Sequence, residues 1–154
     1  MKFTPFDYEK DGAMTAITPS DVEIRELLLS TKTIAIVGVS ANTDRASNHV
    51  ARYLQGKTNY ELFFVNPAAE EILGQKVYKS LAEIDREIDM VDVFRKPEDC
   101  LKILHEAMAI NAKAIWLQLG ISVPEVKSEG EAAGMTVIMD RCIKVDHANL
   151  FRDA

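Results

Sequence analysis

The stretch TIAIVGVSANTDRASN, residues 33–48, decides the fold. Residues 33–39 form a near-continuous run of apolar and β-branched side chains, which is typical of a strand buried on both faces of a parallel sheet. Small, mostly polar residues follow from Ser40, and a helical pattern with apolar positions at Val50, Tyr53 and Leu54 begins near Ser47. The stretch therefore predicts a strand, a tight loop and the start of a helix.

A junction of this kind can bind an anion. The first N–H groups of a helix have no partners within it, and the helix dipole adds positive charge at the same end. Ser40, Asn42 and Ser47 would add neutral donors and Arg45 a cation, so we expect a phosphate group at this loop. The dinucleotide fingerprint G-x-G-x-x-G is incomplete, because Ser40 and Thr43 stand where the second and third glycines would be. On these residues alone, a loop without a ligand stays an alternative.

Composition narrows the class of protein. A chain of 154 residues with 47% hydrophobic and 27% charged residues can form a globular core without disulfides or a metal. Its net charge of −6 argues against a nucleic-acid surface, and no apolar run is long enough to span a membrane. Cys100 and Cys142 lack the spacing of a disulfide framework or a metal site. We expect a cytoplasmic protein with an N-terminal arm over residues 1–18 and a single domain over residues 19–154.

Strand and helix patterns alternate along the chain. Apolar runs predict further strands over residues 60–65, 76–78, 90–94, 114–119 and 136–139. Helices are expected over residues 47–57, from Pro97, and in a last short segment from Asp146. Three pairs with the spacing of a capping box predict additional helix starts, namely Ser20/Glu23, Ser80/Glu83 and Ser122/Glu125.

This alternation predicts a three-layer α/β fold, a Rossmann-like, doubly wound and mostly parallel sheet with strand order 3-2-1-4-5 and a further strand at the end. In that order the chain reverses its direction of winding beside the first strand, and ligands bind at the carboxyl ends of the strands there. The crevice would be built from the loops over residues 40–48, 66–69 and 95–96.

The second strand argues against NAD. It ends at Val65-Asn66-Pro67, where an NAD site has an acidic residue for the ribose. The chain is also too short to supply a separate substrate domain. A phosphate-rich ligand bearing an adenine fits better, with Arg45, Arg95 and Lys96 as cations around the crevice.

Several segments together resemble a known family. They are IAIVGVSANTDRASNHVARYL, FFVNP, EILGQKVYKSL, IDMVDVFRKPED, AKAIWLQLGI and VIMDRCIKVDH. In these segments, over residues 20–150, the chain is similar to the small stand-alone coenzyme A (CoA) binding proteins. Those proteins resemble the nucleotide-binding domain of the succinyl-CoA synthetase α subunit.

The resemblance implies a Rossmann-like domain that holds CoA. The diphosphate would lie on the loop over residues 38–48, the adenosine near Asn66-Pro67, and Phe94-Arg95 would border the crevice. The implied cofactor-binding residues are Gly38, Val39, Ser40, Ala41, Asn42, Arg45, Ser47, Asn48, Asn66, Pro67, Phe94, Arg95 and Lys96.

One departure from the synthetase concerns the 3′-phosphate. The synthetase has a lysine shortly after the matching proline, near the adenosine 3′-phosphate, whereas this chain has Ala68 and Ala69. Either Arg45, Arg95 or Lys96 supplies that charge instead, or the 3′-phosphate is held weakly. Ligase activity is not expected, because the synthetase's phosphorylated histidine lies in a domain that this chain lacks.

We therefore expect a protein that binds CoA or an acyl-CoA, with no catalytic machinery, metal, nucleic-acid partner or membrane partner. The alternative is a small NAD(P)- or CoA-dependent enzyme, or a thiol-redox protein, that uses Cys142 or His147 at the same crevice. Cys142, beside Arg141 and Lys144, would then form a mixed disulfide with the coenzyme thiol. A small residue in a packed turn is the simpler interpretation of Cys142. A third possibility is an empty nucleotide fold used only for interactions.

Overall fold

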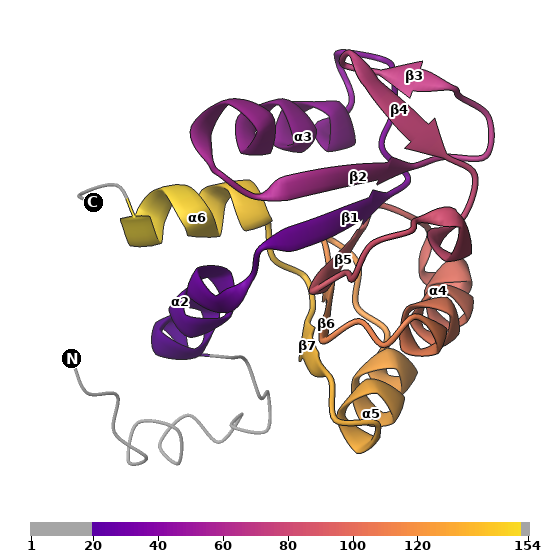
Figure 1. The fold of residues 1–154 in the computed structure, drawn as a ribbon. Coiled ribbons are helices and arrows are strands. Elements are labelled where there is room, and N and C mark those ends of the chain that lie inside the picture. Colours follow the sequence, from indigo (N-terminus) through magenta and orange to yellow (C-terminus); the bar gives the residue numbers. More distant parts are fainter. Residues whose placement is uncertain (1–19, 152–154) are drawn as a thin grey trace.

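The computed structural model describes residues 20–151, so the arm expected over residues 1–18 lies outside the described residues. Within them the chain forms one sheet with helices on both faces (Figure 1). The strands are β1 (Thr33–Val37), β2 (Glu61–Val65), β3 (Glu71–Ile72), β4 (Gln75–Tyr78), β5 (Met90–Val93), β6 (Ala114–Leu117) and β7 (Thr136–Ile138). The helices are α2 (Asp21–Ser30), α3 (Ala46–Lys57), α4 (Pro97–Ala109), α5 (Pro124–Ala132) and α6 (Ile143–Phe151), with a 3-10 turn at Leu81–Glu83.

The order of the strands is β3-β4-β2-β1-β5-β6-β7. Every neighbouring pair is parallel except β3 and β4, which are antiparallel. The predicted order 3-2-1-4-5 with a further strand at the end corresponds to β4-β2-β1-β5-β6-β7 and is confirmed. The doubly wound α/β fold class is therefore confirmed as well.

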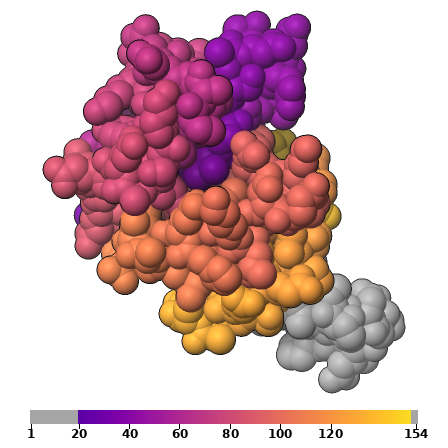
Figure 2. All heavy atoms as spheres, turned by 90° about the vertical axis from the view of Figure 1, so that its right-hand side faces the viewer, coloured from indigo at the N-terminus to yellow at the C-terminus, as the bar shows by residue number. Residues whose placement is uncertain are grey.

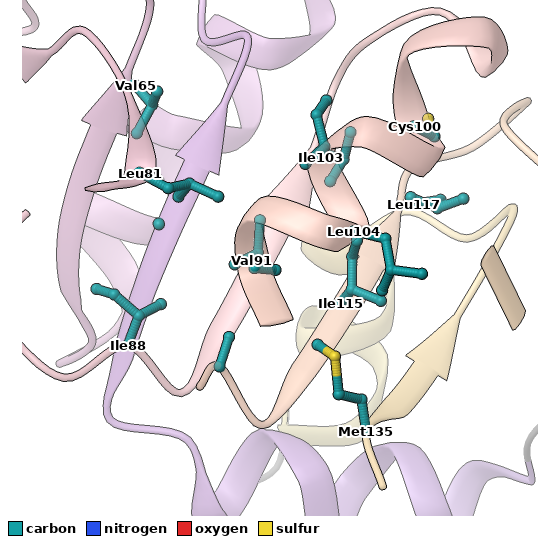
Figure 3. Packing of buried hydrophobic residues seen from close by; sticks show 14 of the residues in the cluster. Val65, Leu81, Ile88, Val91, Cys100, Ile103, Leu104, Ile115, Leu117 and Met135 are labelled. Carbon is teal, nitrogen blue, oxygen red and sulfur yellow. The ribbon is translucent and has the colours of Figure 1, made fainter. Parts of the chain in front are cut away.

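Two buried clusters fill the space between the sheet and its two helical layers. In Figure 1, α2, α3 and α6 lie on one side of the sheet, and α4 and α5 lie on the other. Figure 3 shows the cluster on the α4 and α5 side of the sheet. In this cluster, Leu104 and Ile103 of α4 pack against Val91 of β5 and Ile115 of β6. Met90, next to Val91 in β5, belongs to the opposite cluster. Side chains alternate between faces along a strand, so β5 is buried on both, as its apolar run predicts.

One strand of the sheet was not predicted. β3 joins β4 through a turn in which Leu73 and Gly74 both have positive φ angles, 52° and 76°. Two-residue hairpin turns of this kind usually carry Asn or Asp before Gly, and Leu73 gives no such signal. The prediction of a short strand near residues 76–78 is confirmed by β4.

Of the three predicted capping boxes, the one at Ser20 is confirmed. There Ser20 Oγ accepts from Glu23 N and Glu23 Oε1 accepts from Ser20 N. The box predicted at Ser122 is wrong, because α5 begins one residue later than that spacing requires, after Val123, and no side chain caps it. Pro124, whose fixed φ suits the first helical position, accounts for that start.

Two further helix starts differ from the predictions. After Ser80 the chain makes only the 3-10 turn, and Glu83 Oε1 accepts from Lys79 N instead of closing a box. The last helix begins at Ile143 and not at Asp146, whose carboxylate accepts two hydrogen bonds from Arg141, at 2.8 and 2.7 Å. Among residues 20–151, no helix has both the length and the apolar composition needed to cross a membrane.

Candidate functional site

The end of β1 is packed so closely that only glycine fits there. Gly38 has a φ of 93°, and its N–H donates to the carbonyl of Val65 in β2 at 2.9 Å. On the other side, Phe94 N donates to the carbonyl of Val37 at 2.9 Å. A Cβ at Gly38 would overlap the carbonyl oxygen of Phe94. The carboxyl ends of β2, β1 and β5 therefore lie side by side at the edge of the sheet where the strand order predicts the crevice.

The loop after Gly38 is held by its own polar side chains. Ser47 Oγ accepts from Ser40 N at 2.9 Å, and Asn48 Nδ2 donates to the Ser40 carbonyl at 2.8 Å. Ser40 Oγ accepts from Asn42 N, and Asn42 Oδ1 accepts from Asp44 N. The polar residues that were predicted to bind a ligand therefore also hold the loop in its conformation. A serine hydroxyl that accepts one hydrogen bond still has a hydrogen to donate, so Ser40 and Ser47 keep a donor each.

Two helices begin at the crevice without a capping side chain. α3 begins after Arg45 and α4 begins after Lys96, and neither of these residues makes a side-chain cap hydrogen bond. The N–H groups of Ala46 and Ser47 in α3 and of Glu98 in α4 therefore have no acceptor within residues 20–151, in contrast to the fully capped α2; Pro97, the first residue of α4, has no N–H. Two helix dipoles and two basic side chains are directed at the same place, which favours an anion.

A hollow of about 650 Å³ lies between these two helix starts. Figure 2 shows the surface hollowed there, with the dark violet end of β1 recessed behind the purple loop and the salmon start of α4. Of the residues implied to bind the cofactor, those that line it are Gly38, Ser40, Arg45, Ser47, Asn66, Phe94, Arg95 and Lys96. No carboxylate, imidazole or thiol is among its lining residues.

The remaining predicted residues lie elsewhere around the same loops. Pro67 lines a second hollow, described below, while Val39, Ala41, Asn42 and Asn48 line neither. The side chains of Val39 and Asn48 are buried, whereas Ala41 and Asn42 are exposed on the outside of the loop. Val39 and Asn48 support the crevice from behind, because the Val39 carbonyl accepts a hydrogen bond from Asn66 Nδ2 at 2.8 Å and Asn48 donates to Ser40.

The second hollow, of about 330 Å³, adjoins the first and shares Gly38 and Arg95 with it. It extends between the end of β2, the 3-10 turn and α4, and it contains a cation that the sequence analysis missed. Lys79 Nζ lies 3.4 Å from the carbonyl oxygen of Pro67 and 3.3 Å from that of Ala69. Lys79 follows β4, whose Tyr78 pairs with Val65 of β2. The sequence signal that could have identified Lys79 was the weak strand pattern over residues 76–78, because a strand there, parallel to β2, ends at the edge of the crevice.

A buried acid lies in the strand beside the crevice. Asp92 of β5 has no exposed surface, Gln118 Nε2 donates to its Oδ1, and its Oδ2 has no partner within residues 20–151. Burial raises the pKa of Asp92 to about 7, although the hydrogen bond from Gln118 works in the opposite direction. Asp92 does not line the hollows and so cannot contact a ligand there.

Neither residue of the enzyme alternative lines the crevice. Cys142 is half-buried and packs against the core cluster on the α2, α3 and α6 side of the sheet. His147 Nδ1 lies 2.9 Å from the hydroxyl of Tyr53, and its ring packs against those of Tyr53, Tyr60 and Phe151. Burial lowers the pKa of His147. Among residues 20–151, no group of three or more His, Cys, Asp or Glu side chains is placed to hold a metal ion.

Sequence comparison identifies the family. Residues 32–148 match the family model of the CoA binding domain. The chain belongs to this CoA-binding family. The match includes every loop that forms the crevice.

Two relatives are similar over most of their length. The uncharacterized protein YneT of Bacillus subtilis (strain 168) is 43% identical to this CoA-binding domain over 130 residues, which are 84% of this chain and 96% of YneT. The solved structure of a hypothetical protein from Pyrococcus horikoshii OT3 is similar with a TM-score of 0.82 at 35% identity. That match covers 86% of this chain and 92% of the other.

A more distant match is to one part of a synthetase chain. The apo form of the dinucleotide forming acetyl-coenzyme A synthetase 1 from Ca. Korarchaeum cryptofilum has a TM-score of 0.66 at 19% identity. The match covers 73% of this chain and 26% of the synthetase chain. At this identity the similarity shows the shared fold alone.

Proposed function

We propose that this protein binds CoA or an acyl-CoA at the crevice and has no catalytic machinery of its own. The observation that carries the proposal is the convergence of two uncapped helix starts, with Arg45 and Lys96, on one hollow of about 650 Å³. Membership of the CoA-binding family supports the same ligand. A diphosphate placed there would accept hydrogen bonds from helix N–H groups and serine hydroxyls, and it would be charge-balanced by the basic side chains.

The composition of the crevice supports binding without catalysis. General acid–base and nucleophilic catalysis need a titratable or nucleophilic side chain within reach of the ligand. The first hollow has no carboxylate, imidazole or thiol, and Cys142 and His147, the two residues of the enzyme alternative, lie outside both hollows. The proposed cytoplasmic location stays a prediction from the sequence.

Native mass spectrometry of the protein as purified, followed by titration of the stripped protein with CoA, NAD and ATP, tests the proposed function. Retained CoA, or tighter binding of CoA than of NAD or ATP, is the expected result. Preference for NAD would support a dinucleotide enzyme instead. Binding of none of the three would favour the use of the fold for interactions alone.

Arg45→Ala is expected to weaken CoA binding by about 2 kcal/mol, within the range for hydrogen bonds to charged groups. Arg45 is exposed and lines the first hollow, and no carboxylate within residues 20–151 lies close enough to form an ion pair with it. Isothermal titration measures the affinity, and thermal unfolding should show an unchanged midpoint. Lys57→Ala, an exposed cation at the other end of α3 that lies outside both hollows, is the matched control. Equal affinities of Arg45→Ala and the unaltered protein would remove Arg45 from the site.

A further inference from the structure

The second hollow contains one cation whose charge is not balanced by an acid. Its ionic lining residues are Lys79, Arg95, Lys102, Asp99 and Glu106. Arg95 Nη2 lies 2.9 Å from Asp99 Oδ2, and Lys102 Nζ lies 4.0 Å from Glu106 Oε2. Both acids are therefore paired with the other two cations. Within residues 20–151, no carboxylate oxygen lies within 4.0 Å of Lys79 Nζ.

Backbone contacts place the Lys79 ammonium over the loop that follows β2. The carbonyl oxygens of Pro67 and Ala69 lie 3.4 and 3.3 Å from its Nζ. The same loop is fixed to β4, because Asn66 N donates to the carbonyl of Tyr78 at 2.9 Å. Two neutral carbonyls orient the ammonium without neutralising it, and an ammonium has three hydrogens to donate. Lys79 is thus held at the crevice edge with charge left for an anion.

The position of Lys79 relative to the first hollow matches the chemistry of CoA, and this step rests on the proposed function. CoA has two phosphate groups attached to one ribose, the diphosphate at the 5′ carbon and a single phosphate at the 3′ carbon. A diphosphate bound at the starts of α3 and α4 therefore leaves the 3′-phosphate one sugar away. The second hollow lies next to the first and shares Gly38 and Arg95 with it.

We propose that Lys79 binds the 3′-phosphate of CoA and so makes the site select CoA over dephospho-CoA. Arg45 and Lys96 line the first hollow only, which assigns them to the diphosphate. Arg95 lines both hollows but is already paired with Asp99. An ammonium is a compact point charge with rotatable donors, which suits a terminal phosphate group.

The test is isothermal titration of the full chain and of Lys79→Met with CoA and with dephospho-CoA, at one fixed salt concentration. The unaltered protein is expected to bind CoA at least about tenfold more tightly than dephospho-CoA. Lys79→Met should lose about that factor for CoA and keep its affinity for dephospho-CoA. Lys76→Met is the control, because Lys76 is an exposed lysine of β4 that lines neither hollow.

The outcomes separate this inference from the proposed function. Failure of the unaltered protein to bind CoA would overturn the proposed function and the role of Lys79 with it. Binding of CoA with equal affinity by the unaltered protein and Lys79→Met would overturn the role of Lys79 alone, as would equal binding of CoA and dephospho-CoA by the unaltered protein. Similar losses in Lys79→Met and Lys76→Met would show a general effect of charge and would also overturn it.

Discussion

Gly38→Ala is expected to lower the free energy of unfolding by about 3 kcal/mol and to abolish binding of CoA. A φ of 93° is strained for any residue with a Cβ. The added methyl group would also overlap the Phe94 carbonyl and press on the Arg95 side chain. Relief of this overlap must move β1 away from the end of β5. Backbone strain and overpacking each cost about 1 to 3 kcal/mol, and the expected loss of about 3 kcal/mol lies within the sum of these two costs.

Binding is lost in this variant because Gly38 belongs to both hollows. A shift of β1 relative to β5 changes the distance between the start of α3, which follows β1, and the start of α4, which follows β5. The two groups of donors then no longer fit one diphosphate. Chemical unfolding measures the stability, and titration with CoA measures the binding.

Gly56→Ala is the matched control for Gly38→Ala. Gly56 lies inside α3, has no positive φ, and a Cβ there would meet nothing within 4 Å. Replacing a helical glycine by alanine usually stabilises by up to about 1 kcal/mol. An unfolding curve of Gly38→Ala that matches that of the unaltered protein would show that the packing at the end of β1 is looser than described.

Asp92→Asn is expected to raise the free energy of unfolding at pH 8 by about 2 to 4 kcal/mol. Burial raises the pKa of Asp92 from its ordinary value of 3.8 to about 7, against the smaller effect of the hydrogen bond from Gln118. The difference between these values corresponds to about 4 kcal/mol of penalty for the charged carboxylate in the folded state. Asparagine is neutral and keeps an oxygen for Gln118. Its amide hydrogens need acceptors, so part of the gain is lost.

The pH dependence gives this prediction a definite sign. An acid with a raised pKa in the folded state takes up a proton on folding at pH values between 3.8 and about 7. The contribution of Asp92 is therefore most favourable below pH 3.8, falls as the pH rises towards about 7, and then stays level. The stability gained by Asp92→Asn should be larger at pH 8 than at pH 5. Equal gains at both pH values would contradict the assignment.

Asp89→Asn is a control for which the opposite effect on the free energy of unfolding is expected. Burial alone would raise the pKa of Asp89, but hydrogen bonds from the backbone N–H groups of Lys32 and Thr33 lower it overall, with help from Lys113. An acid with a lowered folded pKa stabilises the protein above its ordinary pKa, and this stabilisation is lost as the pH falls through the folded value. Asp89→Asn should therefore destabilise the protein at pH 8. Urea unfolding at pH 5 and pH 8 gives the free energy of unfolding of the unaltered protein, Asp92→Asn and Asp89→Asn. The lowered pKa of His147 affects all three in the same way, so its contribution cancels in the differences between them.

The sequence was sufficient to predict the sheet because its strands are buried on both faces. In a chain of this length, a short apolar run such as residues 33–37 has few structures open to it other than a buried strand. The helices that alternate with these strands restrict the order of the strands in the sheet. The position of the crevice follows from that order, so the loops bearing Arg45, Asn66 and Arg95 were predicted together. The predictions failed where a local signal was weak or was overridden. Leu73 takes a positive φ without being a usual turn residue, and Pro124 sets a helix start that the Ser122 box does not.

Two features of the site were not predicted, because the signals for them in the sequence are weak. Lys79 reaches the crevice only through the pairing of β4 with β2, in a segment with a short and weak strand pattern. Asp92 is a single polar residue in an apolar strand, and its burial and raised pKa follow from its neighbours on β1 and β6 and from Gln118 rather than from its own surroundings in sequence.

The short antiparallel hairpin of β3 and β4 also bears on how the protein behaves in concentrated solution. An exposed sheet edge can pair with the edge of another molecule, and such pairing begins aggregation. Within residues 20–151, the sheet ends on one side in β3, which has two residues, and on the other in β7, which has three. Neither edge offers a long row of free N–H and C=O groups. The sheet is therefore poorly suited to edge-to-edge association between copies.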